Sequence, residues 1–419
     1  MEFGGVGTPN SSIGWTETSR SGDRKWDSEV CVSTNVENRR MIPVARPYVG
    51  VEEEEAVVQV LRSGWLSQGQ RVAEFEREFA EYVGAKHAVA VSSCTTALHL
   101  GFVAAGIGSG DEVLCPSLSF IATANSVRYV GATPIFVDID PVTFNLDPSR
   151  IEEAITPRTR AILVVHQIGL PAALSEISEI ANRHRLIVIE DAACAIGSSY
   201  QGQRVGMPHG LLACFSFHPR KILTTGEGGM VTTSNERVAT HIKHLRQHAM
   251  NTSDLTRHQS QKIVLENYDE VGYNFRMTDI QAAVGLVQLG RVDGFITRRR
   301  AMARYYSERL EQLGWLIPPS ESEGSRHNFQ SYMARLTKDA PISRDELMQG
   351  LLDRGISTRR GIMATHRERP YRDVRWDQIL PQTNTVTEEC IILPLFHEMT
   401  EVDQDFVVES ICETALKRC

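Results

Sequence analysis

Short apolar runs alternate with amphipathic segments along most of this chain. Seven of these runs have the length and composition of buried strands: residues 87–91, 112–115, 134–138, 161–165, 186–189, 212–217 and 230–233. Helical spacing of apolar residues follows several of them, at 122–129, 150–155 and 175–184. Strands that are apolar on both faces and alternate with helices form parallel sheets. The pattern therefore predicts an α/β fold with a mostly parallel seven-stranded sheet between helices.

The ends of the chain read differently from this central region. Two amphipathic helices are expected before the first strand, at 52–62 and 72–83, and a polar, loop-rich stretch at 244–267. A helix at 279–289 and a long basic helix at 292–313 lead to a mixed C-terminal region, with strands at 331–336 and 391–393 and helices at 344–354 and 401–416. We expect a disordered extension at 1–40, a large domain with its N-terminal segment at 41–290, and a linking helix with a small α+β domain at 291–419.

Composition limits the class of protein. The chain has 419 residues, 42% of them hydrophobic and 23% charged, which is ordinary for a globular protein with a large core. A net charge of -8 argues against nucleic acid as a partner. No apolar run approaches the ~20 residues of a membrane span. The eight cysteines contain no CxxC pair and several lie in apolar runs, so we expect reduced thiols in a cytoplasmic protein and no metal site.

One lysine stands between the last two predicted strands, in CFSFHPRKILTTGEGGM (Cys214–Met230). Burial would lower the pKa of the Lys221 amine, so that it could attack an aldehyde and later carry a proton. The cofactor that uses such a lysine is pyridoxal 5′-phosphate (PLP), an electron sink. The alternative is that Lys221 is a solvated surface charge, as most lysines are.

Several candidate residues follow predicted strands, where ligands bind in parallel sheets: Thr95, Phe120, His166 and Asp191. The hydroxyl-rich stretch around Thr95 opens a helix and would suit a phosphate, or would only cap the helix. Asp191 could keep a pyridine nitrogen protonated, or could be a helix N-cap. Phe120 could stack on a pyridine ring, or be a core residue.

The chain from about Met41 to its end resembles the DegT/DnrJ/EryC1/StrS group of PLP-dependent sugar aminotransferases. Eight phrases carry the resemblance, in the correct order: IPVARPYVG, GWLSQGQRVAEFE, VSSCTTALHL, GDEVLCPSLSFIATANSV, GATPIFVDID, EDAACAIGSSYQG, SFHPRKILTTGEGGMV and GYNFRMTDIQAAVGLVQL. The resemblance implies the PLP-dependent transferase fold type I and a homodimer with active sites at the subunit interface. It also implies a nucleotide-linked keto-sugar substrate.

The same resemblance implies roles for individual residues. Lys221 falls on the lysine that forms the Schiff base, Asp191 on the carboxylate partner of the pyridinium, and Phe120 on the aromatic residue that stacks on the ring. The remaining cofactor contacts are phosphate ligands: Thr95, Thr96, Ser216 and, reaching the cofactor of the neighbouring subunit, Asn274.

Three departures from the family pattern concern the site. Cys94 stands where the commonest form has Gly. Cys194 stands where relatives usually carry Gln or His against the cofactor or substrate, and a thiol is a weak hydrogen-bond partner. The loop GISTRRGIMATHRERPY also differs. Its charged residues could meet a diphosphate or the donor carboxylate, or be solvated. The candidate substrate contacts are therefore His166, Cys194, Arg359, Arg360 and His366.

These residues predict a transaminase that moves an amino group from an amino acid, L-glutamate by resemblance, to a keto group of a nucleotide-linked sugar. Pyridoxamine 5′-phosphate would carry the amine between the two half-reactions. Relatives that deoxygenate sugars carry His at the lysine position, so Lys221 argues against that activity. Two alternatives stay open: an aminotransferase for a keto-cyclitol, and a regulatory protein that binds PLP without turnover.

Overall fold

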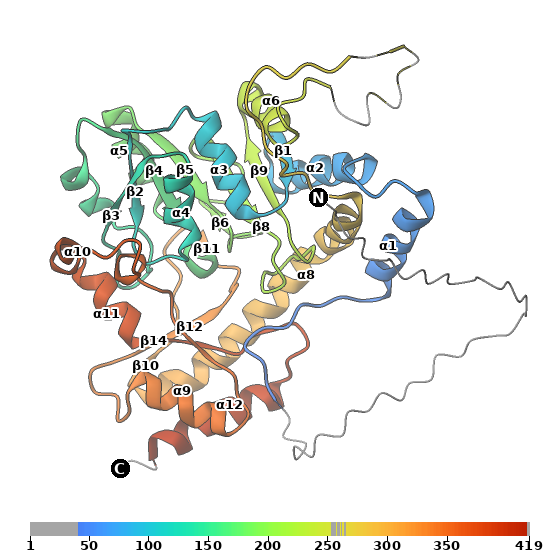
Figure 1. Cartoon of the computed structure of the whole chain (residues 1–419). Helices are drawn as coiled ribbons and strands as arrows, with labels where there is room; N and C mark the ends of the chain where they lie inside the picture. The colour runs from blue at the N-terminus through green and yellow to red at the C-terminus, as the bar shows by residue number, and fades with distance from the viewer. Residues whose placement is uncertain (1–40, 253–256, 258–259, 261, 264, 417–419) are drawn as a thin grey trace, which may run out of the picture. The chain divides into compact units, whose positions relative to one another are not determined.

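A seven-stranded sheet forms the centre of the computed structural model, which describes residues 41–416 except 253–256, 258–259, 261 and 264 (Figure 1). The strand order is β1-β9-β8-β5-β4-β2-β3, and the five strands β8, β5, β4, β2 and β3 run parallel to one another. Strand β9 is antiparallel to both β1 and β8. The bounds are His87–Val91 (β1), Glu112–Pro116 (β2), Thr133–Val137 (β3), Thr159–Val165 (β4), Ile187–Asp191 (β5), Leu212–Ser216 (β8) and Gly229–Thr233 (β9). All seven predicted strands are confirmed within two residues.

Alternation of side chains along the strands builds two apolar layers. In β1, Val89 and Val91 pack in one core cluster, whereas Ala88 and Ala90 pack in another on the opposite face. The first face is covered by α3 (Cys94–Ala104), α4 (Ala122–Tyr129) and α6 (Glu236–Leu245), and the second by α2 (Gln70–Val83), α5 (Leu174–His184) and α8 (Asp279–Leu310). The sheet is therefore buried on both faces, which is why its strands are apolar at successive positions.

The helix α8 connects two regions of the fold. Its first half packs against the central sheet, and its second half packs in a separate core with Tyr332 and Leu393. That core contains an antiparallel four-stranded sheet and two helices: β10 (Leu316–Ile317), β12 (Tyr332–Leu336), β14 (Cys390–Leu393), β13 (Arg359–Arg360), α9 (Arg344–Asp353) and α12 (Glu401–Leu416). The predicted break between 289 and 292 is wrong, since α8 is continuous. The domain boundary at 290 stays a prediction, and the predicted extension at 1–40 lies outside the described residues.

Other elements show where local patterns mislead. The predicted helix at 150–155 is wrong: Pro148–Arg150 and Glu152–Ala154 form two 3₁₀ turns, the first capped by Asp147. Helix α6, which begins after the N-cap Asn235, was not predicted. The remaining elements are short or flank the sheet: α1 (Val51–Ser63), β6 (Ser199–Tyr200), β7 (Gln203–Arg204), β11 (Ser325–Arg326), α10 (Val374–Ile379) and α11 (Pro381–Glu389). Within the described ranges, no helix is long and apolar enough to cross a membrane.

Candidate active site

Lys221 lies in the connection between β8 and β9. Its backbone N–H donates to the His218 carbonyl at 2.8 Å, and its Nζ lies 3.1 Å from the Cys194 Sγ. Burial lowers the pKa of Lys221, but Cys194, Cys94 and Asp191 raise it, and the net direction is upward. The expectation of a lowered amine pKa is therefore wrong for the chain by itself, because sulfur and carboxylate groups surround the ammonium.

Asp191 is the last residue of β5, at the carboxyl edge of the sheet. It accepts a hydrogen bond from the Thr123 hydroxyl at 2.8 Å and one from the Ala193 backbone N–H at 3.2 Å. Burial raises the pKa of this carboxyl, while Thr123, Ala193 and Lys221 act in the opposite direction. A buried carboxylate with a raised pKa is stabilised by any added positive partner. A protonated pyridine nitrogen is such a partner.

The predicted ring and phosphate contacts surround the same edge of the sheet. Phe120 follows β2 and is 65% exposed, so the core alternative is wrong for this aromatic residue. In the first turn of α3, Thr96 forms a capping box with the N-cap Ser93, and its hydroxyl donates to the Ser93 carbonyl at 2.8 Å. Thr95 beside it and Ser216 at the end of β8 are half-buried. This turn can therefore both cap the helix and bind an anion, because backbone N–H groups at the start of α3 stay available to a phosphate.

Gly229 allows this helix start to approach the sheet. A Cβ at Gly229 would lie 2.4 Å from the Ser93 carbonyl carbon, too close for any other residue without a shift. The edge of the sheet thus offers a buried carboxylate, an exposed aromatic face, a helix N-terminus and an amine. These groups fit the pyridine nitrogen, ring, phosphate and aldehyde of PLP.

His166 does not lie with these groups. Its side chain is fully buried, with Nδ1 accepting from the Ala172 backbone N–H and Nε2 3.1 Å from Glu190. Since Nδ1 accepts, Nε2 carries the proton and donates to the carboxylate. The predicted substrate contact for His166 is wrong, because both ring nitrogens are bound within the protein.

His366 is also held inside the protein. Its Nδ1 lies 2.7 Å from the Ser117 hydroxyl and its Nε2 lies 3.1 Å from the Asn384 side-chain oxygen. The substrate contact predicted for His366 is wrong for the same reason. Instead, the ring ties the loop after β13 to the residues that follow β2, and the Thr365 backbone N–H adds a bond to the Ser117 carbonyl.

The two predicted arginines differ from each other. Both are exposed on β13, but Arg360 pairs with Glu368 at 3.7 Å. The pKa of Arg359 is lowered by burial and by the neighbouring Arg220. Arg359 thus belongs to a group of cations near Lys221, whereas Arg360 already has a carboxylate partner.

Comparison with known proteins decides the family. The family model for the DegT/DnrJ/EryC1/StrS aminotransferase family matches residues 47–412. The chain belongs to this family. The family resemblance predicted from the eight phrases is therefore confirmed.

Alignments of this aminotransferase with curated and solved relatives cover nearly the whole length of those relatives. It is 42% identical to the GDP-perosamine synthase of Caulobacter vibrioides over 88% of this chain and 97% of the relative. It is 39% identical to the spore coat polysaccharide biosynthesis protein SpsC of Bacillus subtilis, over 88% and 96% respectively. A putative sugar aminotransferase of Streptococcus pneumoniae, Spr1654, was solved in PMP and PLP forms. The PMP form is 27% identical, covers 90% of this chain and 100% of its own, and has a TM-score of 0.85.

These findings establish the chemistry of the aminotransferase at the level of its class. The fold is type I of the PLP-dependent transferases, and the cofactor is PLP, with pyridoxamine phosphate as its aminated form. The alternative of a regulatory protein without turnover does not stand, since the chain is a transaminase by family and relatives.

Two neighbours of the site were missed at the level of sequence. Thr123, one helical turn after Phe120, is the hydroxyl donor to Asp191. Arg220 lies next to Lys221 and, with Arg359, lowers the pKa of His218, although burial is the larger cause and Glu227 opposes it. The signal for Arg220 was its position inside the lysine motif. Thr123 gave no signal, because threonine is common in helix first turns.

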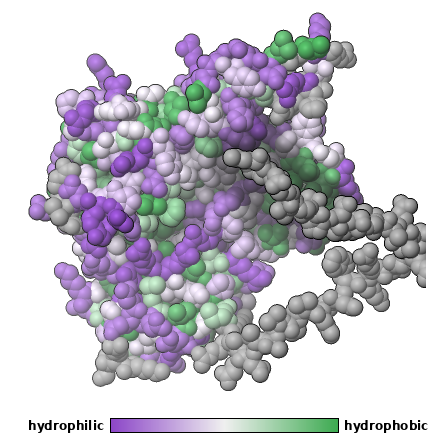
Figure 2. Space-filling view, in the orientation of Figure 1, coloured by the Kyte–Doolittle hydropathy of each residue, from purple (hydrophilic) through white to green (hydrophobic). Residues whose placement is uncertain are grey.

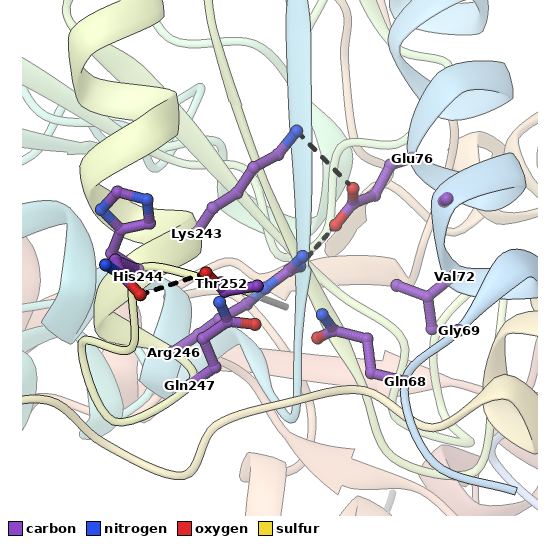
Figure 3. Close-up of a pocket in the computed structure, with 11 residues that line it drawn as sticks. Gln68, Gly69, Val72, Glu76, Lys243, His244, Arg246, Gln247 and Thr252 are labelled. Atoms are coloured by element: carbon purple, nitrogen blue, oxygen red, sulfur yellow. Dashed lines mark hydrogen bonds and ion pairs between the residues drawn. The ribbon is translucent and has the colours of Figure 1, made fainter. Parts of the chain in front are cut away.

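A separate cavity of about 320 Å³ lies between α2 and the end of α6 (Figure 3). On its wall, the carboxylate of Glu76 meets Arg246 and, at 3.9 Å, Lys243. Its lining contains none of the predicted cofactor contacts: Gln68, Gly69, Val72, Ala73, Glu76, Lys243, His244, Arg246, Gln247, Asn251 and Thr252. Since its charges are already paired, we do not assign it to the reaction.

Proposed function

We propose that this aminotransferase transfers an amino group from an amino acid, L-glutamate, to a keto group of a nucleotide-linked sugar. The observation that supports the site assignment is the convergence of Lys221, Asp191 and Cys194 at the carboxyl edge of the sheet. The curated relatives named above support the sugar substrate and a role in polysaccharide biosynthesis. We place the enzyme in the cytoplasm, where buried thiols such as Cys115 and Cys214 stay reduced.

The residues divide the work of the reaction. Bound PLP supplies an electron sink for the carbanion at the donor α-carbon. Lys221 would hold the cofactor through its Nζ and, once displaced, move the proton from the donor α-carbon. Asp191 would keep a proton on the pyridine nitrogen. Phe120 would lie against the ring. Thr95 and Ser216 would hold the phosphate at the start of α3 as hydroxyl donors, and Thr96 would join them once its hydroxyl turns away from the Ser93 carbonyl.

The cations near Lys221 suit an anionic substrate group. Arg359 and Arg220 are both exposed, and each lowers the pKa of His218 by adding positive charge beside it. Among described residues, Glu227 is the acidic group that offsets this charge at His218. We assign Arg359 and Arg220 to the diphosphate or the donor carboxylate, which guanidinium groups bind in bidentate fashion. Arg360 has a partner and is left out of this role.

The spectrum of the purified protein tests the assignment of Lys221. PLP held by a lysine absorbs at longer wavelength than pyridoxamine phosphate. We expect excess L-glutamate to remove the long-wavelength band of the wild type, and Lys221→Ala to lack that band and to lose turnover by about 10²-fold or more. The aminated protein would then be offered nucleotide-linked keto-sugars and keto-cyclitols. Turnover by Lys221→Ala at the wild-type rate would refute the assignment.

The proposal includes a homodimer with shared active sites. Asn274 is exposed, and the segment before it, between α6 and α8, carries exposed apolar side chains: Ile263, Leu265, Tyr268 and Val271. Green surface is visible at the upper right of Figure 2, where this segment projects in Figure 1. An exposed apolar patch of this kind marks a protein interface. Asn274 would reach the partner's cofactor phosphate.

The Lys221→Ala variant also tests this dimer. In a mixed dimer, one protomer carries Lys221→Ala and the other carries Asn274→Ala. The first protomer then supplies an intact Asn274 and the second an intact Lys221, which together complete one of the two sites. Refolding the two weak variants together should therefore restore about a quarter of wild-type turnover, because half of the dimers are mixed and each has one complete site. Absence of any recovery beyond the sum of the two variants would contradict shared sites.

A further inference from the structure

The segment His327–Gln330, between β11 and β12, contacts the peptide units on both sides of Lys221. The Gln330 side-chain oxygen accepts from the Ile222 backbone N–H at 3.0 Å, and its Nε2 donates to the Arg220 carbonyl at 2.6 Å. Gln330 is buried. The single amide group of Gln330 therefore binds the backbone on both sides of Lys221, with one donor and one acceptor, as the backbone of a neighbouring strand would.

The same segment holds the loop that carries Cys194. The Asn328 Nδ2 donates to the Cys194 carbonyl at 2.8 Å and to the Ile196 carbonyl at 2.9 Å. The Asn328 side-chain oxygen accepts from the Gln330 backbone N–H at 2.8 Å. Two loops that follow different strands of the central sheet thus meet on one short segment, and across them the Cys194 sulfur lies 3.1 Å from the Lys221 amine.

The His327–Gln330 segment is itself fixed from α8. The buried guanidinium of Arg299 donates to the carbonyls of Phe329 and Gln330 at 2.8 and 2.9 Å, and to that of Leu395 at 3.0 Å. Burial lowers the pKa of Arg299 to about 10, so this group stays charged at neutral pH. Phe329 has a φ of 50°, in the left-handed region that costs a bulky residue energy. Such a backbone persists only where its surroundings impose it.

A glycine in the loop after β4, Gly169, makes room for the Asn328 side chain. Gly169, with a φ of 102°, lies so close to Asn328 that a Cβ there would be 1.8 Å from the Asn328 side-chain oxygen. Any other residue at 169 would push Asn328 away from the Cys194 loop. The contact therefore depends on complementary residues from two distant parts of the chain.

We propose that Gln330 and Asn328 are positioning residues for amino transfer, which set the Lys221 amine and the Cys194 sulfur relative to each other. The proposal rests on the proposed role of Lys221. A lysine side chain has four rotatable bonds, so fixing its backbone limits where its amine can go. A misplacement of ~1 Å at a reacting group can cost about 10²-fold in rate.

The test compares Gln330→Leu with a matched control, Gln404→Leu. Gln404 is also buried and also donates to a backbone carbonyl, that of Met302 at 2.9 Å, but it lies in the C-terminal core away from Lys221. Backbone hydrogen exchange of cofactor-free protein would be followed at Ile222. We expect exchange to be roughly tenfold faster in Gln330→Leu and unchanged in Gln404→Leu.

The kinetic readout uses the PLP-loaded enzyme and L-glutamate. We expect Gln330→Leu to lower kcat of the donor half-reaction roughly ten- to hundredfold with little change in KM, and Gln404→Leu to leave both unchanged. Should Gln330→Leu fail to fold, Gln330→Glu keeps the acceptor for Ile222 and loses the donor to Arg220, so a smaller loss of kcat is expected.

Several outcomes would overturn the inference. Equal kcat in Gln330→Leu and Gln404→Leu would do so, and so would unchanged exchange at Ile222. Faster exchange with wild-type kcat would show that Gln330 orders the backbone without serving the reaction. Failure of the proposed function would be recognised by a different result, namely turnover by Lys221→Ala at the wild-type rate. The hydrogen-exchange measurement at Ile222 does not depend on turnover, so the two failures can be told apart.

Discussion

Two carboxylates at the end of β5 face opposite layers of the sheet, and their surroundings differ. Glu190 points to the α5 layer, where its oxygens accept from His166 Nε2 at 3.1 Å and from the His209 and Gly210 backbone N–H groups at 2.7 and 3.4 Å. Asp191 points to the α3 layer, near the Lys221 ammonium. Both are buried.

The comparison shows that burial alone does not identify a functional carboxylate. Glu190 is bound by groups that serve only to connect strands and loops of the fold. Asp191 shares its surroundings with an amine, a thiol and a nearby exposed aromatic residue, which have no common structural task. Asp191 is recognised as a functional carboxylate because the groups around it, unlike those around Glu190, have no role in holding the fold together.

The largest expected effect separates the two carboxylates by turnover. Asp191→Asn keeps the shape and an acceptor for Thr123 but removes the negative charge that would stabilise a protonated ring nitrogen. We expect kcat of the donor half-reaction to fall about 10²–10³-fold, the size of loss seen when one preorganised electrostatic group is removed. Single-turnover absorbance with L-glutamate measures it. Wild-type rates would place Asp191 beside Glu190 as a structural carboxylate.

The opposite substitution should act on stability. In Glu190→Gln, the amide NH₂ faces either the His166 Nε2–H or the backbone N–H groups of His209 and Gly210, so at least one donor loses its acceptor. We expect the free energy of unfolding to fall by about 1–3 kcal/mol, while turnover per folded molecule stays near that of the wild type. Urea denaturation with activity per folded fraction measures both. A loss of turnover without a loss of stability would contradict this division of roles.

The smallest expected effect is on the pH dependence of the stability of the cofactor-free protein. Because burial raises the pKa of Asp191 in the folded state, its contribution to stability is fully present below its unfolded pKa and is lost as pH rises through the folded pKa. Between these two pKa values, stability should fall by at most about 1.4 kcal/mol per pH unit relative to Asp191→Asn. Denaturation of both proteins from pH 4 upward tests this; parallel curves would show that Asp191 has an ordinary pKa.

The pattern of apolar runs predicted the central sheet because each strand is buried on both faces. The motifs predicted Lys221 and Asp191, since their chemistry is carried by the residue and by its place after a strand. The pattern could not distinguish Asp191 from His166, because both follow strands; which layer a side chain faces depends on the register of the strand. It also missed Gln330 and Asn328, whose contacts join residues more than a hundred positions apart.

The continuous helix α8 has a consequence for recombining this enzyme with its relatives. At 32 residues it is roughly 48 Å long, and it contributes side chains to two hydrophobic cores. A chimera joined at residue 290 would combine two halves of one helix that come from different parents, and each half packs in a different core. Junctions that exchange C-terminal parts should therefore lie before Asp279, so that the whole helix comes from one parent and Arg299 stays with the carbonyls of Phe329, Gln330 and Leu395.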